Sequence, residues 1–263
     1  MFRHEGPSRR PATNTLVAGY LAFIAGFVNS GGFILIGSFT SHVTGSIGRI
    51  STDMASGDAG AAAFAVLLVM MFFLGAFGAT LLLEGYKANQ ISQAYATALL
   101  VEGGLLSLFI FVAGLSHATH PRLLDAEAAI LCLAMGVQNS LVTRLSGAVV
   151  RTTHLTGVIT DLGIETARWY RWHRLKLNAL PVLLGAGVKP ERPLPQRVTL
   201  LGTIVILFVA GAMLGAVLTM RASRWAMALP ALAVLAASGL AFLQRAVAAP
   251  APAPVPVSEP PEE

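Results

Sequence analysis

The chain has 263 residues, of which 55% are hydrophobic and only 12% are charged. A soluble domain needs about a quarter of its residues charged, so this composition excludes a soluble globular protein and indicates a multi-span membrane protein. The formal net charge is +5 at pH 7, but the basic residues flank apolar stretches. That pattern orients membrane helices and speaks against a nucleic-acid partner. The single cysteine, Cys132, lies within an apolar stretch, which excludes a disulfide framework and a cysteine-based metal site.

Residues 1–13 form a basic tail, and the first apolar stretch follows it directly. A bilayer-spanning helix needs about 20 mostly apolar residues. Six segments meet this requirement, and they cover residues 14–38, 60–83, 93–116, 126–145, 198–220 and 226–245. Because these runs are long and lack the two-residue alternation of a membrane barrel, we expect an all-α membrane protein.

The chain contains two related halves. The sequence Ser-His-Val-Thr-Gly at 41–45 recurs as Thr-His-Leu-Thr-Gly at 153–157, and each copy follows an apolar helix that carries an Asn-Ser pair. Each half, 14–116 and 126–245, holds three expected spans, and residues 117–125 connect the halves. Three is an odd number, so the halves must have opposite orientations in the bilayer. This predicts two inverted three-helix repeats with broken segments after helices 1 and 4, an arrangement typical of transporter cores.

Small residues recur at intervals of four along the first and fourth expected spans, and pairs of them occur in the second and fifth. In lipid, helices associate by close backbone approach through such residues. We therefore expect the first and fourth spans at the centre of the protein, with the second and fifth packed beside them. The expected packing residues are Ala18, Ala22, Gly26, Gly75, Ala79, Gly136, Gly211 and Gly215.

Polar residues recur at equivalent positions of the two halves. Asn29 and Asn139 lie within apolar helices. A buried amide is costly unless it is hydrogen-bonded, so these side chains either tie helices together or line a solute path. Thr44 and Thr156 are suitable N-cap residues, and a half-helix that begins at each would direct its positive dipole end at an anionic group. The alternative is that each threonine only caps a helix.

These observations define the candidates for a solute path, which are Asn29, Ser30, His42, Thr44, Gly45, Gln138, Asn139, His154, Thr156 and Gly157. The two histidines could move protons, since imidazole titrates near neutral pH, and a structural hydrogen-bonding role is the alternative for each. Two histidines without spaced cysteines or carboxylates do not predict a metal site.

Glu102 lies within the third expected span, where an ionised carboxylate is expensive. We interpret it as a candidate for proton coupling, and the alternative is a carboxyl group hydrogen-bonded between helices. The sequence contains no Walker loop, dinucleotide fingerprint or HExxH pair. We therefore expect neither an enzyme nor a bound cofactor or metal.

The second half carries a basic insert at 158–197, which includes the run RWYRWHR at 168–174. Aromatic rings and arginines suit the lipid headgroup layer, so we expect residues 160–176 to form a helix at the cytoplasmic interface. A solvated basic loop is the alternative. Residues 246–263 are rich in Pro and Ala, and we expect them to be disordered. Most of the 18 Lys and Arg residues fall on one side of the membrane, which predicts cytoplasmic N- and C-termini.

Four motifs resemble the YoaK-like family of bacterial membrane proteins. They are AGFVN at 25–29, SHVTG at 41–45, AMGVQNS at 134–140 and RTTHLTG at 151–157. The resemblance covers residues from about 15 to 245. It implies a multi-pass protein of the bacterial inner membrane. It implies no catalytic residues, because the domain of that family has no assigned function.

From these features we expect a small secondary transporter or permease in the lipid bilayer, for a small solute that the sequence does not name. An anionic solute, proton coupling and a homodimer are all compatible with the sequence. The alternative is a non-transporting assembly or regulatory protein that binds a partner or lipid through its basic cytoplasmic segment. An intramembrane enzyme acting on lipid is a third reading.

Overall fold

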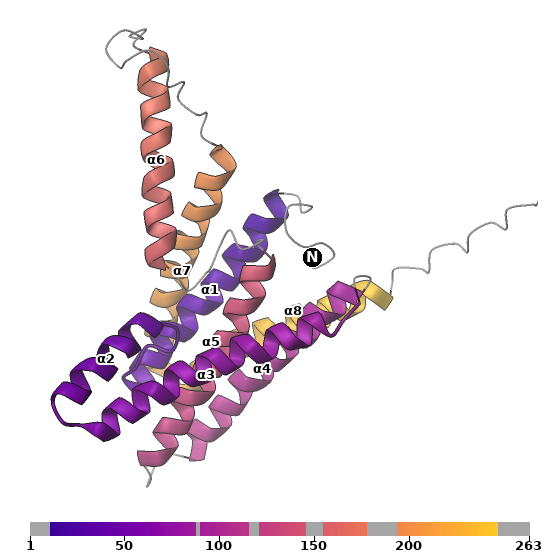
Figure 1. The fold of residues 1–263 in the computed structure, drawn as a ribbon. Helices are drawn as coiled ribbons and strands as arrows, with labels where there is room; N and C mark the ends of the chain where they lie inside the picture. The colour runs from indigo at the N-terminus through magenta and orange to yellow at the C-terminus, as the bar shows by residue number, and fades with distance from the viewer. Residues whose placement is uncertain (1–10, 88–89, 116–120, 146–154, 178–193, 247–263) are drawn as a thin grey trace, which may run out of the picture.

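The computed structural model describes residues 11–87, 90–115, 121–145, 155–177 and 194–246. Within these ranges every regular element is a helix and no strand is present, so the expected all-α class is confirmed. The helices are α1 (Pro11–Ile36), α2 (Val43–Ala55), α3 (Ala59–Glu84), α4 (Ile91–Leu115), α5 (Pro121–Leu145), α6 (Leu155–Leu177), α7 (Pro195–Ala222), the short 3-10 helix η3 (Ser223–Met227) and α8 (Ala228–Ala246). Figure 1 shows α6 extending beyond the bundle that the other long helices form.

Several expectations concern parts of the chain outside the described residues. They are the position of His154, residues 1–10 of the basic tail, residues 117–120 of the connecting loop, residues 178–193 of the basic insert and residues 247–263 of the Pro/Ala-rich tail.

Five stretches of the described chain are long and apolar enough to cross a membrane. They are Thr15–Ile36, Ala59–Glu84, Ile91–Leu115, Leu124–Arg144 and Pro195–Leu243. The fifth stretch has 49 residues and contains α7, η3 and most of α8. The sequence predicted six spans, and its fifth and sixth both fall in this stretch. The helical backbone of α7 is interrupted at Ser223, whose φ is 51°. The short helix η3 then connects α7 to α8 directly, so no loop separates the two predicted spans.

α1 packs closely along α7 (Figure 1). A methyl group on Gly26 would overlap the carbonyl oxygen of Phe208, and one on Gly211 would overlap that of Phe23. Gly215, one turn after Gly211, meets the backbone one turn after Phe23 in the same way. The contacts advance in the same direction along both helices, so α1 and α7 are parallel and their backbones touch where glycine leaves room.

α5 packs along α3 in the same manner. A methyl group on Gly136 would overlap the carbonyl oxygen of Phe72, and one on Gly75 would overlap that of Leu133. Further along, the hydroxyls of Thr80 and Ser140 share a hydrogen bond of 2.9 Å. These contacts again advance in one direction, so α3 and α5 are parallel.

Two further helix pairs, α1 with α5 and α4 with α8, run antiparallel. The Gln138 amide of α5 donates to the carbonyl of Leu21 in α1 at 3.2 Å, and Leu131 of α5 lies close to Gly32 further along α1. In the other pair, the Ser238 hydroxyl of α8 donates to the carbonyl of Ala96 in α4 at 2.7 Å, and Leu235, earlier in α8, lies against Gly103, later in α4. The helices α1, α4, α5 and α8 thus surround the interior of the protein.

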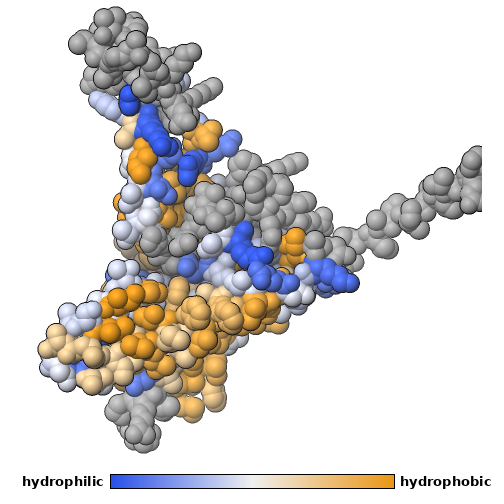
Figure 2. Space-filling view, in the orientation of Figure 1, coloured by the Kyte–Doolittle hydropathy of each residue, from blue (hydrophilic) through white to orange (hydrophobic). Residues whose placement is uncertain are grey.

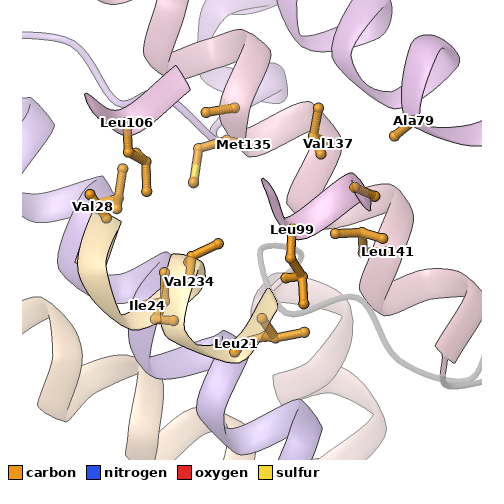
Figure 3. Close-up of a cluster of buried hydrophobic side chains, with 14 of the residues drawn as sticks. Leu21, Ile24, Val28, Ala79, Leu99, Leu106, Met135, Val137, Leu141 and Val234 are labelled. Carbon is orange, nitrogen blue, oxygen red and sulfur yellow. The ribbon is translucent and has the colours of Figure 1, made fainter. Parts of the chain in front are cut away.

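The largest cluster of buried apolar side chains fills that interior (Figure 3). Its members shown there come from α1, α3, α4, α5 and α8, and they are Leu21, Ile24, Val28, Ala79, Leu99, Leu106, Met135, Val137, Leu141 and Val234. The outer surface is apolar as well. Figure 2 shows hydrophobic residues gathered over the spanning helices and hydrophilic residues along α6. An apolar outer surface is what lipid contact requires.

The break after the first span is where the sequence predicts it. α1 ends at Ile36, and Gly37 has a φ of 72°, a conformation that glycine adopts without strain. The predicted helix cap is wrong, because α2 begins at Val43 and its N-cap is His42, not Thr44. The residue before the N-cap, Ser41, donates its hydroxyl to Asn29 of α1. The helix then starts at Val43, two residues earlier than a cap at Thr44 would allow.

The helix expected over 160–176 is present as part of α6, which begins at Leu155. Its apolar residues Leu155, Val158 and Leu162 pack against α1 and α7. α6 begins at the second motif, and α2 begins at the first motif in the same way. The shorter helix α2 is therefore the counterpart, in the first half, of the helical part of the basic insert.

Candidate solute-binding site

A pocket of about 630 Å³ is lined by both halves of the chain. Six of the described residues that line it are polar, and they are Asn29, Ser41, His42, Thr44, Asn139 and Thr156. The apolar part of the wall consists of Phe39, Val43, Phe72, Leu155 and Phe208. Residues from the two Thr-Gly motifs and from the two Asn-Ser helices therefore share one cavity.

The pocket lies midway along the spanning helices. Phe72 is near the middle of α3, and Phe208 is near the middle of α7. His42, Thr44 and Thr156 are nevertheless exposed. Exposed polar side chains at the mid-depth of a bilayer are tolerated where they line a water-filled cavity.

The N-termini of two helices meet at this pocket. Thr44 is in the first turn of α2 and Thr156 is in the first turn of α6. The first four N–H groups of a helix have no partner within the helix and carry the positive end of its dipole. Two such ends directed at one cavity favour a ligand with negative charge.

α2 and α6 leave the pocket toward opposite ends of the bundle. Glu165 of α6 pairs with Arg197 at 3.3 Å, so α6 runs toward the N-terminal end of α7. α2 runs toward the N-terminal end of α3, which follows it after a short turn. α7 is parallel to α1, α3 is parallel to α5, and α1 and α5 are antiparallel, so the two ends lie on opposite sides.

Asn29 is oriented by the first motif. The hydroxyl of Ser41 donates to Oδ1 of Asn29 at 2.9 Å. With the oxygen engaged, the amide N–H groups are what Asn29 can offer to a ligand in the pocket. Sequence reasoning included Ser41 in the motif but not among the path residues, although the hydroxyl at the same position of both motif copies was a usable signal.

Four of the predicted path residues do not line this pocket. Gly45 lines a neighbouring cavity, while Ser30 and Gly157 line neither cavity. Gln138 is fully buried and ties α5 to α1 through the carbonyl of Leu21. The two asparagines, the histidine of the first motif and the two threonines therefore line one pocket. The glutamine, Gln138, lies in the core instead.

Glu102 lies in the core and does not line the pocket. It is 0% exposed, and its neighbours one turn away on either side, Leu99 and Leu106, point into the apolar interior in Figure 3. Neither carboxyl oxygen has a hydrogen-bond partner among the described residues. The alternative of a carboxyl group hydrogen-bonded between helices therefore finds no partner in the described part of the chain.

No group of three or more metal-binding side chains occurs among the residues that the structure describes. The phenylalanine walls of the pocket, Phe39, Phe72 and Phe208, were not found by sequence reasoning. The chain has 13 phenylalanines, most of which suit lipid or core positions, and nothing in the sequence distinguishes these three.

The helices and the shared pocket define a multi-pass helical membrane protein. The chain belongs to the family described as a protein of unknown function, DUF1275, which matches residues 17–240. A UPF0700 transmembrane protein of Rhizobium meliloti (strain 1021) is 26% identical over 234 residues, which cover 89% of this chain and 88% of that protein. No solved structure matches the chain. The expected membership of an uncharacterised family of membrane proteins is confirmed.

Proposed function

We propose that the protein is a small permease or secondary transporter whose solute occupies the pocket between the two Thr-Gly motifs. The observation that carries the proposal is the meeting of two helix N-termini at one mid-depth cavity lined by polar residues from both halves. Discontinuous helices in corresponding positions of two repeats are characteristic of transporter binding sites.

We further propose that the two halves are inverted repeats, and their matched contacts support this. Gly26 and Gly136 occupy equivalent positions, and each abuts the phenylalanine carbonyl of the other half's second span. α7, η3 and α8 then make two crossings, because 49 helical residues extend roughly 70 Å and the hydrocarbon core is about 30 Å thick. Six crossings place both termini on one side, which the basic residues make the cytoplasmic side of the bacterial inner membrane.

The solute class follows from the polar wall of the pocket. Two helix N-termini and the amide donors of Asn29 favour a small solute with an anionic group. Glu102 is the candidate carrier of a coupled proton, because a buried carboxyl without hydrogen-bond partners changes its charge only when water or a partner reaches it. In this role the coupled proton would move through the buried interior around α4, where Glu102 lies, and not through the solute pocket itself.

A flux assay in sealed proteoliposomes tests the proposed function. The purified protein should accelerate uptake of at least one small anion from a panel of carboxylates, phosphate and halides, relative to protein-free vesicles. Thr156→Val, in the pocket, should reduce that uptake at least tenfold. Thr166→Val is the matched control on the same helix but outside the pocket, and it should leave uptake unchanged. Uptake equal to that of empty vesicles across the panel would refute the proposal.

The exposed face of α6 favours a second candidate function, in which the protein is a non-transporting factor that binds lipid or a partner. Trp169 and Tyr170 are 48% and 55% exposed, and Arg171 is exposed beside them. Trp169 stacks on His173 with ring centroids 5.4 Å apart. Changing Arg171 and Arg174 to Glu should then abolish binding to vesicles of anionic phospholipid or recovery of a partner. Unchanged binding would exclude this second function.

A further inference from the structure

A second cavity, of about 280 Å³, lies beside the central pocket between α2 and α3. Gly45, Ser46 and Arg49 of α2 line one side, and Leu68 of α3 lines the other. Among the residues that the structure describes, only Phe39 and His42 line both this cavity and the central pocket. These two rings therefore separate the two spaces. We call the second cavity the outer vestibule.

The His42 ring is held at this position by Phe39 and Gly45, and Phe33 in turn supports Phe39. Phe39 meets it edge-on with centroids 6.2 Å apart, and Phe33 stacks on Phe39 at 4.3 Å. On the other side, a methyl group on Gly45 would overlap Nδ1 of His42. Glycine at this position leaves the space that the imidazole occupies.

The outer vestibule leads away from the pocket along α2. Arg49 lies two turns beyond His42, its side chain is 48% exposed, and its Nε is 3.8 Å from Asp53. Its guanidinium also donates to the hydroxyl of Ser38 at 3.3 Å. α2 ends near the start of α3, so the vestibule points to the side of the membrane at which α3 begins.

We infer that the His42 ring, supported by Phe39, is a partition that controls passage between the outer vestibule and the central pocket. This inference rests on the proposed function for the identity of what passes, since only a moving solute needs the route. The residue that shapes the partition is Gly45, because a side chain there would displace the ring. His42 is thus a positioning residue of the access route as well as part of the pocket wall.

Thiol accessibility tests the partition without requiring transport. Cys132 is the only cysteine in the sequence, so Cys132→Ser provides a background for a single reporter, Thr156→Cys, in the central pocket. A charged, membrane-impermeant methanethiosulfonate reagent is applied to sealed vesicles from the side at which α2 ends. We expect His42→Ala to raise the labelling rate at least tenfold and His42→Trp to lower it at least fivefold.

Two glycine variants on α2 form the matched control. Gly45→Ala displaces the ring and should raise the labelling rate at least fivefold. Gly48→Ala, where an added methyl group meets no atom within 4 Å, should stay within twofold of the background. Elution from a size-exclusion column as a single monodisperse species shows that a variant is folded. If His42→Ala does not elute in this way, the labelling rate of Gly45→Ala is used to test the inference instead.

Two results would overturn the inference. One is a labelling rate within twofold of the background for His42→Ala, His42→Trp and Gly45→Ala. The other is an equal effect of Gly45→Ala and Gly48→Ala, which would assign the change to α2 as a whole. If the expected labelling pattern is found in a protein that transports no solute, the partition is supported and the proposed permease function is refuted. If solute is transported but none of the variants changes the labelling rate, the permease function is supported and the partition is refuted.

Discussion

Single glycines determine how closely the spanning helices approach one another. In lipid, neighbouring helices gain nothing from hydrophobic burial, so their association depends on van der Waals contact and hydrogen bonds. At Gly26, Gly75, Gly136 and Gly211 the opposing carbonyl oxygen occupies the space of a side chain. These positions were predicted from the four-residue spacing of small residues, which reports the helix face directly. The partner backbone at each was not predictable, because nothing in the spacing names the opposite helix.

The glycine contacts predict a sharp difference between two positions on α3. Gly75→Ala should destabilise the folded protein by about 1–3 kcal/mol, because the added methyl group forces the α5 backbone away. Gly78→Ala should have almost no effect, since a methyl group there meets no atom within 4 Å. Thermal unfolding in detergent measures both. Equal melting temperatures for the two variants would contradict the close packing of α3 on α5.

Glu102 gives the second prediction at this scale. Glu102→Gln keeps the shape of the side chain and removes its ability to carry a proton, and no ion pair involving Glu102 occurs within the described residues. We expect a melting temperature within about 2 °C of the parent, uptake that no longer responds to a pH gradient, and solute exchange that persists at symmetrical pH. Glu84→Gln, at an exposed position paired with Arg144, is the control. Uptake by Glu102→Gln that still follows the gradient would exclude Glu102 as the proton carrier.

At the scale of elements, α2 and α6 are the features that make the site. Each begins beside the pocket and continues to one end of the bundle. The motifs predicted where a helix would restart, and this is correct to within two residues for α2. The cap itself was mispredicted, because threonine is a good cap in general and the local sequence does not show that Ser41 already binds Asn29. The length of α6 was predicted in part, from its basic and aromatic run.

The anchoring of α6 on α7 yields a prediction for this element. Glu165 is 6% exposed and pairs with Arg168 at 3.1 Å and with Arg197 at 3.3 Å. Both arginines are about half exposed, so solvent screening limits each pair to roughly 1 kcal/mol or less. Arg197→Ala should therefore speed amide hydrogen exchange along α6 without shifting the global melting temperature by more than about 2 °C. An unchanged rate of amide hydrogen exchange in α6 would show that apolar packing alone keeps α6 against α7.

At the scale of the whole molecule, residues far apart in the sequence form one pocket because the halves exchange partners. α1 packs on the second span of the other half, α7, and α5 packs on α3. The repeated motif, the paired asparagines and the small-residue spacing predicted which polar residues meet and which helix faces pack, since each appears twice at a regular offset. They did not predict that the first span of each half packs on the second span of the other. The aromatic walls, the core position of Gln138 and the partition at His42 were not predictable, because each depends on a contact between helices that sequence periodicity does not encode.

The central claim is that α2 and α6 both begin at one shared pocket and leave it toward opposite faces of the membrane. Single cysteines at Thr52 near the end of α2 and at Thr166 on α6, each in the Cys132→Ser background, test it most directly. An impermeant thiol reagent is applied to sealed vesicles of known orientation. The proposed topology predicts that Thr52→Cys is labelled from one side only and Thr166→Cys from the other side only. Labelling of both cysteines from the same side would contradict it.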